Sequence, residues 1–151
     1  MAAPIPTIYS FMDVILTFVH PVAGTFTANG NIGAGRFIVT NTTDHTVMAV
    51  SSDGATMVSA VPGLLGNLAI EMQQTCAFHK FLLNWSNILL TALQQNDVSN
   101  WATASVEIRS VTDQSVHILT GVAPQKQADK TYEATGQNVT WNLPAATVLN
   151  S

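Results

Sequence analysis

The sequence predicts a mainly β fold, with about seven to nine short strands and one α-helix near residues 76–95. Apolar and polar side chains alternate with a period of two through most of the chain, turn-forming residues separate these segments, and only one segment has a helical period. The 151 residues contain no linker, internal repeat or low-complexity tract, so a single domain covering 1–151 is expected. An α+β monomer with a sheet of about four strands is the rival architecture.

The N-terminal half is predicted to form an arm followed by strands. Residues 1–8, with prolines at positions 4 and 6, are expected to be a short extended arm. Residues 20–35 are rich in glycine and asparagine and are interpreted as turns. Asp53-Gly54 predicts a hairpin, because glycine accepts the positive φ that its turn requires. Period-two alternation predicts strands over 12–18, 36–40, 46–50, 56–61 and 64–73.

One segment changes to the period of an amphipathic helix that packs across a sheet. Thr75 is expected to cap its start, and Asn96 with Asp97 to end it. Its apolar stripe is Phe78, Leu82, Trp85, Leu89 and Ala92. The C-terminal third returns to alternation, which predicts strands over 104–109, 116–119 and 138–143.

The chain carries very little charge. Lys and Arg number 5 and Asp and Glu 9, so charged residues make up 9% of the chain, against about 25% in an average soluble domain. Uncharged polar residues replace them, with 18 Thr, 11 Asn, 10 Ser and 8 Gln. Such side chains exchange water for a neighbour's hydrogen bonds at little cost, and obligate interfaces are depleted of charge. We therefore expect other subunits to cover much of this surface.

The composition argues against several functional classes. Five scattered cations cannot form the basic stripe of a phosphate-gripping protein, and a single cysteine, Cys76, excludes a disulfide or zinc framework. No apolar run of about 20 residues predicts a membrane anchor, and no export signal is recognised, so folding in a cytoplasm is expected. No catalytic motif occurs, and no ligand spacing relates the four histidines: His20, His45, His79 and His117. Enzyme activity, metals and cofactors are not expected, and Cys76 is interpreted as a small buried apolar residue.

Short motifs in a fixed order resemble one group of tail tube proteins from contractile-tailed bacteriophages, the myovirus tail tube family. The resemblance covers nearly the whole chain. One departure is Cys76-Ala77, where the family often has Ser-Pro at the helix start, and residues 20–32 match only loosely. The motifs are Tyr9-Ser10-Phe11-Met12-Asp13-Val14, Asp53-Gly54 followed by Met57, Leu64–Met72 leading into Thr75, Asn87 and Leu90, Trp101, Gly121-Val122, Tyr132, and Val139-Thr140-Trp141.

This resemblance implies a tail-tube-like β-barrel or sandwich with one flanking helix. Six copies form a ring, the inner strands join into a lumen barrel, and rings stack into a tube that conducts the genome inside a contractile sheath. The implied partners are further copies, the tail sheath protein, baseplate and tail terminator proteins and, without specific binding, the tape measure protein and passing DNA. The implied location is the virion tail, assembled in the bacterial host cytoplasm.

Two other functions remain open at this point. The same fold serves pyocin and type VI secretion tubes, so the chain resembles those as well. A small cytosolic hydrolase or binding domain is the alternative from a different class. Neighbouring genes for capsid and terminase would separate a phage tube from the others.

Two kinds of functional surface are predicted. The hairpin at Asp53 and Gly54 is expected to project and contact another subunit, with Met57 beside it. Trp101 fits the core and an interface equally well.

A wall along which DNA slides should be polar and neutral to acidic, because each Lys or Arg contact with phosphate adds friction. Sequence alone leaves open which strand face lines such a wall and whether these faces are simply the solvated outside. The candidate lumen residues are Asn67, Glu71, Gln73, Ser105 and Glu107.

Overall fold

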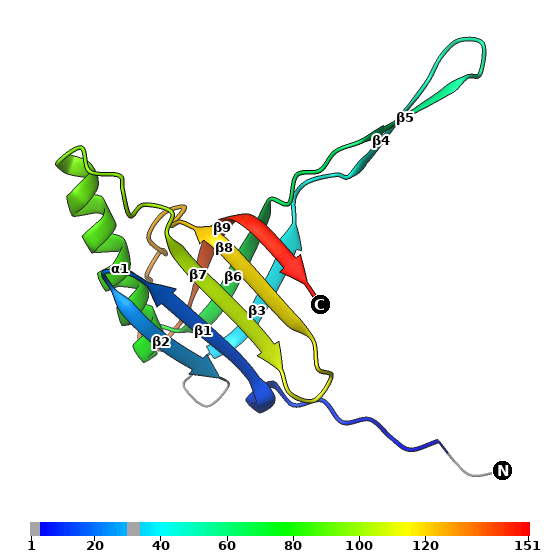
Figure 1. Ribbon diagram of the computed structural model, residues 1–151. Coiled ribbons are helices and arrows are strands. Elements are labelled where there is room, and N and C mark those ends of the chain that lie inside the picture. The colour runs from blue at the N-terminus through cyan, green and yellow to red at the C-terminus, as the bar shows by residue number, and fades with distance from the viewer. Residues whose placement is uncertain (1–3, 30–33) are drawn as a thin grey trace.

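The computed structural model describes residues 4–29 and 34–151, and it shows a curled antiparallel sheet, one helix and one projecting hairpin (Figure 1). The seven strands of the sheet follow the order β2-β1-β7-β8-β9-β6-β3, and β4 pairs with β5 in the hairpin. The elements are η1 (Phe11–Asp13), β1 (Val14–His20), β2 (Gly24–Asn29), β3 (Ala34–Asn41), β4 (Thr46–Val50), β5 (Thr56–Ala60), β6 (Gly66–Gln73), α1 (Ala77–Gln94), β7 (Ala104–Ser110), β8 (Val116–Val122) and β9 (Asn138–Asn150).

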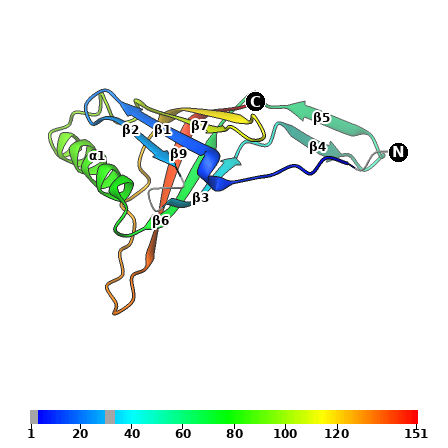
Figure 2. The same ribbon diagram turned by 90° about the horizontal axis from the view of Figure 1, so that it is seen from below.

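These elements confirm the mainly β prediction with one helix. The seven-stranded sheet curls into a half-barrel, and α1 packs on its inner side at one end (Figure 2). The rival α+β fold with a small sheet is therefore wrong. No helix among the described residues is both long and apolar enough to cross a membrane.

The long strand β9 joins the two halves of the curled sheet. Its residues 138–145 pair with β6, and its residues 145–150 pair mainly with β8. At the change of partner a Cβ on Gly66 would overlap Val148, so only glycine fits there. The curl therefore depends on one strand that belongs to both halves and on a glycine where they cross.

The core lies between the inner face of the sheet and α1. Phe18 of β1 is at its centre, with edge-to-face contacts to Phe78 and Trp85 of the helix. Such aromatic pairs add stabilisation beyond the area they bury. Trp85 and Trp141 are fully buried, and Cys76 is buried as predicted.

The start of α1 differs from the prediction that Thr75 caps it. Cys76 occupies the N-cap position and makes no side-chain capping bond. The Cys76 N–H donates to the Gln73 carbonyl, so Thr75 lies inside the preceding turn, where its hydroxyl is not at the cap. The end is as expected, because the helix stops at Gln94 and Asn96 takes a φ of 59°.

The interpretation of residues 20–35 as turns is wrong for β2. This strand begins at Gly24, whose φ of 97° turns the chain back from β1, and it then pairs along the whole of β1. Its alternation of Thr25 and Thr27 with Phe26 and Ala28 is short and adjoins many turn-forming residues, which hid the strand signal. Residues 30–33, and with them part of the loosely matching segment 20–32, lie outside the described residues.

His79 is a buried polar group on α1, and it makes the fold sensitive to acid. Its Nδ1 accepts a hydrogen bond of 3.0 Å from the Trp141 indole N–H. Burial lowers the pKa of His79 below its ordinary value of 6.5, and the Lys130 ammonium lowers it further. The unfolded chain then binds a proton at His79 more readily than the folded protein does.

We therefore expect the free energy of unfolding to fall as the pH drops below about 6.5. His79→Asn keeps an acceptor for Trp141 but cannot be protonated, so its loss of stability between pH 7 and pH 5 should be smaller than that of the wild type. Urea denaturation at the two pH values measures this difference. An equal loss in both proteins would contradict the role of His79.

Candidate assembly interface

No group of three or more His, Cys, Asp or Glu within the described residues could hold a metal ion. Two histidines have structural roles instead. Nδ1 of His20 accepts from the N–H groups of Val22 and Ala23, and His79 bonds to Trp141.

The hairpin formed by β4 and β5 is built by a local turn. The Asp53 carboxylate accepts a hydrogen bond of 3.0 Å from the Ala55 N–H and another from the Ser51 hydroxyl, and Gly54 has a φ of 89°. The Ser51 hydrogen bond, followed by that of Ala55, lowers the pKa of Asp53. The turn therefore carries one carboxylate whose ionised form these bonds favour, while both strands are uncharged.

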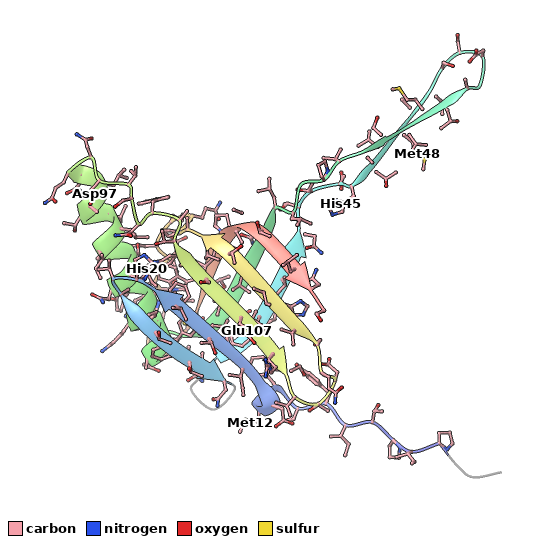
Figure 3. The ribbon with its side chains drawn as sticks, viewed as in Figure 1. Met12, His20, His45, Met48, Asp97 and Glu107 are labelled. Carbon is pink, nitrogen blue, oxygen red and sulfur yellow. The ribbon has the colours of Figure 1, made fainter. Side chains whose placement is uncertain are left out.

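All residues of β4 and β5 are exposed in the isolated subunit. Large apolar side chains make up much of this surface: Met48 is 66% exposed, and Met57 65%. The hairpin leaves the body beyond His45 and projects away from it, with Met48 far from the sheet (Figure 3). A lone two-stranded hairpin is marginally stable in water, and exposed apolar patches mark interaction sites. This hairpin is therefore a candidate contact surface for another subunit.

The sheet has two edge strands, β2 and β3, because its half-barrel is open. Each has a neighbour on one side only. Unpaired N–H and C=O groups on such an edge invite pairing with another chain. The two edges are therefore a second candidate surface for contact between copies.

The candidate lumen residues from two separate strands lie on the same face of the sheet. Asn67, Glu71 and Gln73 of β6 alternate with the buried residues of that strand, and so do Ser105 and Glu107 of β7. All five therefore lie on the face away from the core and α1. Sequence treated them as two alternatives, and sheet pairing places them on one continuous surface.

Charges on this face balance one another. Glu107 accepts a hydrogen bond of 3.0 Å from Arg109, and Arg36 lies directly across from Glu71 in the β3–β6 register. These four are the lysines, arginines, aspartates and glutamates within the described strands of the sheet. An exposed pair adds little stability, but each acid here has an arginine beside it. The charged groups on this face therefore sum to zero, and exposed Ile38, Ile118 and Leu149 lie on it beside the polar side chains.

Trp101, for which the sequence left core and interface open, lies between the core and the surface. Its ring is partly buried and packs against the core cluster. It also lines a shallow surface hollow near the end of α1 with Leu93, Val98 and Ala102. Structure therefore places Trp101 at the border of the core, accessible to a neighbour.

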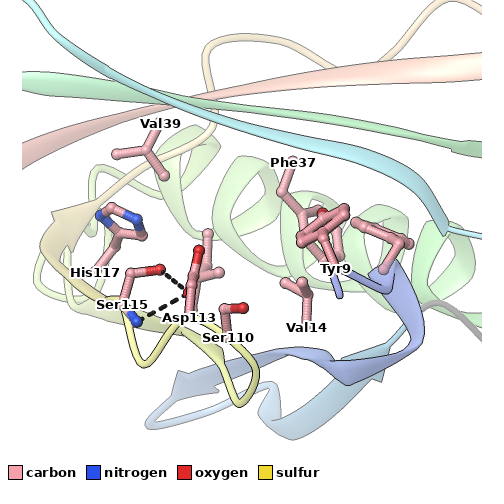
Figure 4. A pocket seen from close by; sticks show the side chains of 10 residues that line it. Tyr9, Val14, Phe37, Val39, Ser110, Asp113, Ser115 and His117 are labelled. Atoms are coloured by element: carbon pink, nitrogen blue, oxygen red, sulfur yellow. Dashed lines mark hydrogen bonds between the residues drawn. The ribbon is translucent and has the colours of Figure 1, made fainter. Parts of the chain in front are cut away.

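Sequence analysis missed a cavity at the open end of the half-barrel. It has a volume of about 230 Å³ and lies between the arm and β3 on one side and the β7–β8 turn on the other (Figure 4). Phe11 of η1 packs on Phe37 of β3 at its rim, with ring centroids 5.2 Å apart. The alternating prolines and apolar residues before Tyr9 are a sequence signal that could have drawn attention to the arm beside it.

Comparison with known proteins places this geometry in context. The family model of the bacteriophage PhiTE tail tube protein matches residues 6–150. No curated protein sequence matches the chain significantly.

Three solved structures have a similar fold. A chain in the cryo-EM structure of the anti-feeding prophage cap, which terminates the tube, matches with a TM-score of 0.60 and 12% identity over 100% of this chain and 94% of that one. Two chains come from an extracellular contractile injection system in the extended state. The match in its sheath–tube complex has a TM-score of 0.60 and 12% identity over 98% and 91% of the two chains. The match in its sheath/tube terminator has a TM-score of 0.59 and 12% identity over 99% and 98%.

The exposure of the hairpin leads to a prediction about the dissociated subunit. Met48→Asp should change its free energy of unfolding by less than about 0.5 kcal/mol, because Met48 contacts no core residue. The contrasting variant Leu68→Ala, in the buried face of β6, should cost about 2–5 kcal/mol. Urea denaturation measures both. If Met48→Asp cost as much as Leu68→Ala, the hairpin would be packed on its own body.

Proposed function

Because the chain belongs to the bacteriophage PhiTE tail tube protein family, we propose that it self-assembles into stacked hexameric rings that form the genome-ejection channel inside a contractile sheath. The family is one of structural proteins, which leaves the hydrolase alternative without support. The observation that carries the proposal is the hairpin, whose apolar strands are fully exposed and have no partner surface on their own subunit.

Ring formation follows from the open sheet. A head-to-tail contact between copies closes a ring when the rotation between them divides a full turn. Both edge strands of the half-barrel sheet, β2 and β3, are unpaired on one side, so either edge can take part in a contact that is repeated from one copy to the next. Low charge supports this role, because uncharged polar groups are desolvated at little cost.

Stacking is assigned to the hairpin. It projects well beyond the body (Figure 1), so it reaches a copy that its own ring does not contain. Met57 and the other apolar side chains of β4 and β5 become buried in that contact. Stacked rings of this kind form an open tube whose length is not limited by symmetry.

The channel wall is assigned to the polar face that contains Asn67, Glu71, Gln73, Ser105 and Glu107. Amides and hydroxyls bind a duplex weakly, and the two arginines on this face each have a carboxylate beside them. Phosphate contacts from unpaired cations would hold the DNA through counterion release. A neutral polar wall lets the tape measure protein and the DNA pass without specific binding.

The proposed partners follow from this place in the tail. They are the sheath outside the tube and the baseplate and tail terminator proteins at its ends. Virion tails would be its final location, after assembly in the host cytoplasm. A tube of a non-phage contractile injection system is the second candidate, because solved structures of such systems share the fold. Capsid and terminase genes beside this one would favour the phage tail.

Lengthening the hairpin turn tests stacking. Insertion of a bulky loop between Asp53 and Gly54 should abolish tube formation in negative-stain micrographs while the circular dichroism spectrum stays that of the wild type. The control Asp53→Asn removes the charge without adding bulk and should still allow tubes to form. Normal tubes from the insertion variant would refute a role of the hairpin in stacking.

Reversing a charge on the polar face tests the channel wall. Glu71→Lys should leave assembled tubes that retain short duplex DNA at low salt and release it as salt rises, because unpaired cations then line the channel. Glu133→Lys makes the same charge change at an exposed residue of the loop between β8 and β9, outside the strands of the sheet. Filter retention of labelled DNA compares the two. Equal retention by both variants, or none by Glu71→Lys, would place the wall elsewhere.

A further inference from the structure

The N-terminal arm is an extended segment without a partner. Its residues 4–9 are all exposed, and none makes a hydrogen bond to any described residue. Ile5 is 90% exposed and Ile8 75%. The arm points away from the body on the side opposite α1 (Figure 2). This uncharged segment with two exposed isoleucines therefore extends away from its own subunit, to where another copy would lie in an assembly.

The edge of β3 offers matching backbone groups. In an antiparallel pair, alternate residues direct their N–H and C=O groups to the partner strand. The Thr42 N–H donates to the Leu65 carbonyl at 2.9 Å, which continues the β3–β6 register, so the even-numbered residues of β3 face β6. The backbone groups of Phe37, Val39 and Asn41 therefore point outward, and nothing in the described part of the chain bonds to them.

The same residues border the cavity at the open end of the half-barrel. Phe37 and Val39 line one wall, and Val14 and Ile108 extend the apolar lining (Figure 4). A strand added to the edge of β3 would run along this cavity and direct every second side chain into it.

From these observations we propose that residues 4–9 of one copy add as a strand to the free edge of β3 in a neighbouring copy, with an isoleucine in the cavity. The inference rests on the proposed function, since it requires copies to assemble. As a strand, six residues span about 20 Å, which matches most of β3. Strand addition of this kind gains affinity from backbone hydrogen bonds and specificity from alternate side chains.

The two prolines of the arm determine which residues pair. Pro4 and Pro6 have no N–H and lie two residues apart, so both direct their backbone to the same side. The arm can form every backbone hydrogen bond to β3 only when the side that contains Pro4 and Pro6 faces solvent. Ile5, Thr7 and Tyr9 then bond with β3. Prolines at these positions also prevent other strands from adding to the outer side of the arm.

Either strand direction fills the cavity. In an antiparallel pair, Ile5 lies opposite an outward-facing residue of β3 and shares its inward side-chain direction. In a parallel pair, the arm residues opposite Phe37 and Val39 are those whose backbone groups face solvent. Ile8 is one of them, so its side chain points into the cavity instead of that of Ile5. The arm is favoured over a neighbour's hairpin as the occupant, because the strands of the hairpin already satisfy half of their backbone groups in each other.

Two variants at Thr7 test the pairing, since this residue makes no hydrogen bond to the described part of its own subunit. Thr7→Pro removes a pairing N–H and should raise the critical concentration for tube assembly at least about tenfold. The matched control Thr7→Ala keeps that N–H and should raise it less than about threefold. Sedimentation of tubes over a concentration series measures both. Equal assembly of Thr7→Pro and the wild type would overturn the proposal, whereas a wild type that never assembles would overturn the proposed function instead.

Cross-linking identifies the occupant and shows whether it comes from another copy. Variants with one added cysteine, Thr7→Cys and Val39→Cys, are mixed, assembled and treated with a short bis-maleimide, while the native Cys76 is buried. A covalent dimer should form from this mixture and not from Thr7→Cys with Ser99→Cys, a site beyond α1. Dimers from Met48→Cys with Val39→Cys in its place would assign the cavity to the hairpin, and no dimer from either mixture would overturn the strand addition.

Discussion

The curl of the sheet around α1 is the constraint on which the other features depend. Because β9 pairs with β6 through one half and with β8 through the other, the sheet bends and separates a buried apolar concave face from an exposed outer face. The helix fills one end of the concave side, and Phe18, Trp85 and Trp141 are buried there. The opposite end remains open, and the exposed segments of the protein are near it.

The open half-barrel buries its apolar core but leaves parts of its surface without partners. Its two edge strands keep unpaired backbone groups, its hairpin keeps apolar side chains in water, and its arm makes no hydrogen bond to the described residues. A subunit meant to remain alone would protect such edges with charge, and this chain places almost none on them. Balanced pairs such as Glu107 with Arg109 lie on the polar face instead. Low charge, open sheet edges and exposed apolar segments thus all support the proposed assembly of this subunit with further copies.

Much of the fold could be predicted because its signals are local. The alternation through β6 and the stripe from Phe78 to Leu89 depend only on which residues face the core, and both elements lie where their periods predict. Asp53-Gly54 forms its hairpin through contacts within a few residues. The strand β2 was not predicted, because turn-forming residues around it obscured its alternation. The prediction that Thr75 caps α1 was wrong, because a hydrogen bond from the Cys76 N–H to the Gln73 carbonyl fixes the turn before the helix.

The sequence by itself determined a mainly β chain with one helix, a projecting hairpin with uncharged strands and a surface poor in charge, because periodicity, turn chemistry and composition are properties of neighbouring residues. Only the tertiary structure decided that Asn67 and Glu71 share a face with Ser105 and Glu107, and that Phe37 and Val39 border a cavity. These relations join residues from distant parts of the chain. They depend on strand order and register, which long-range backbone pairing fixes and which no local pattern contains.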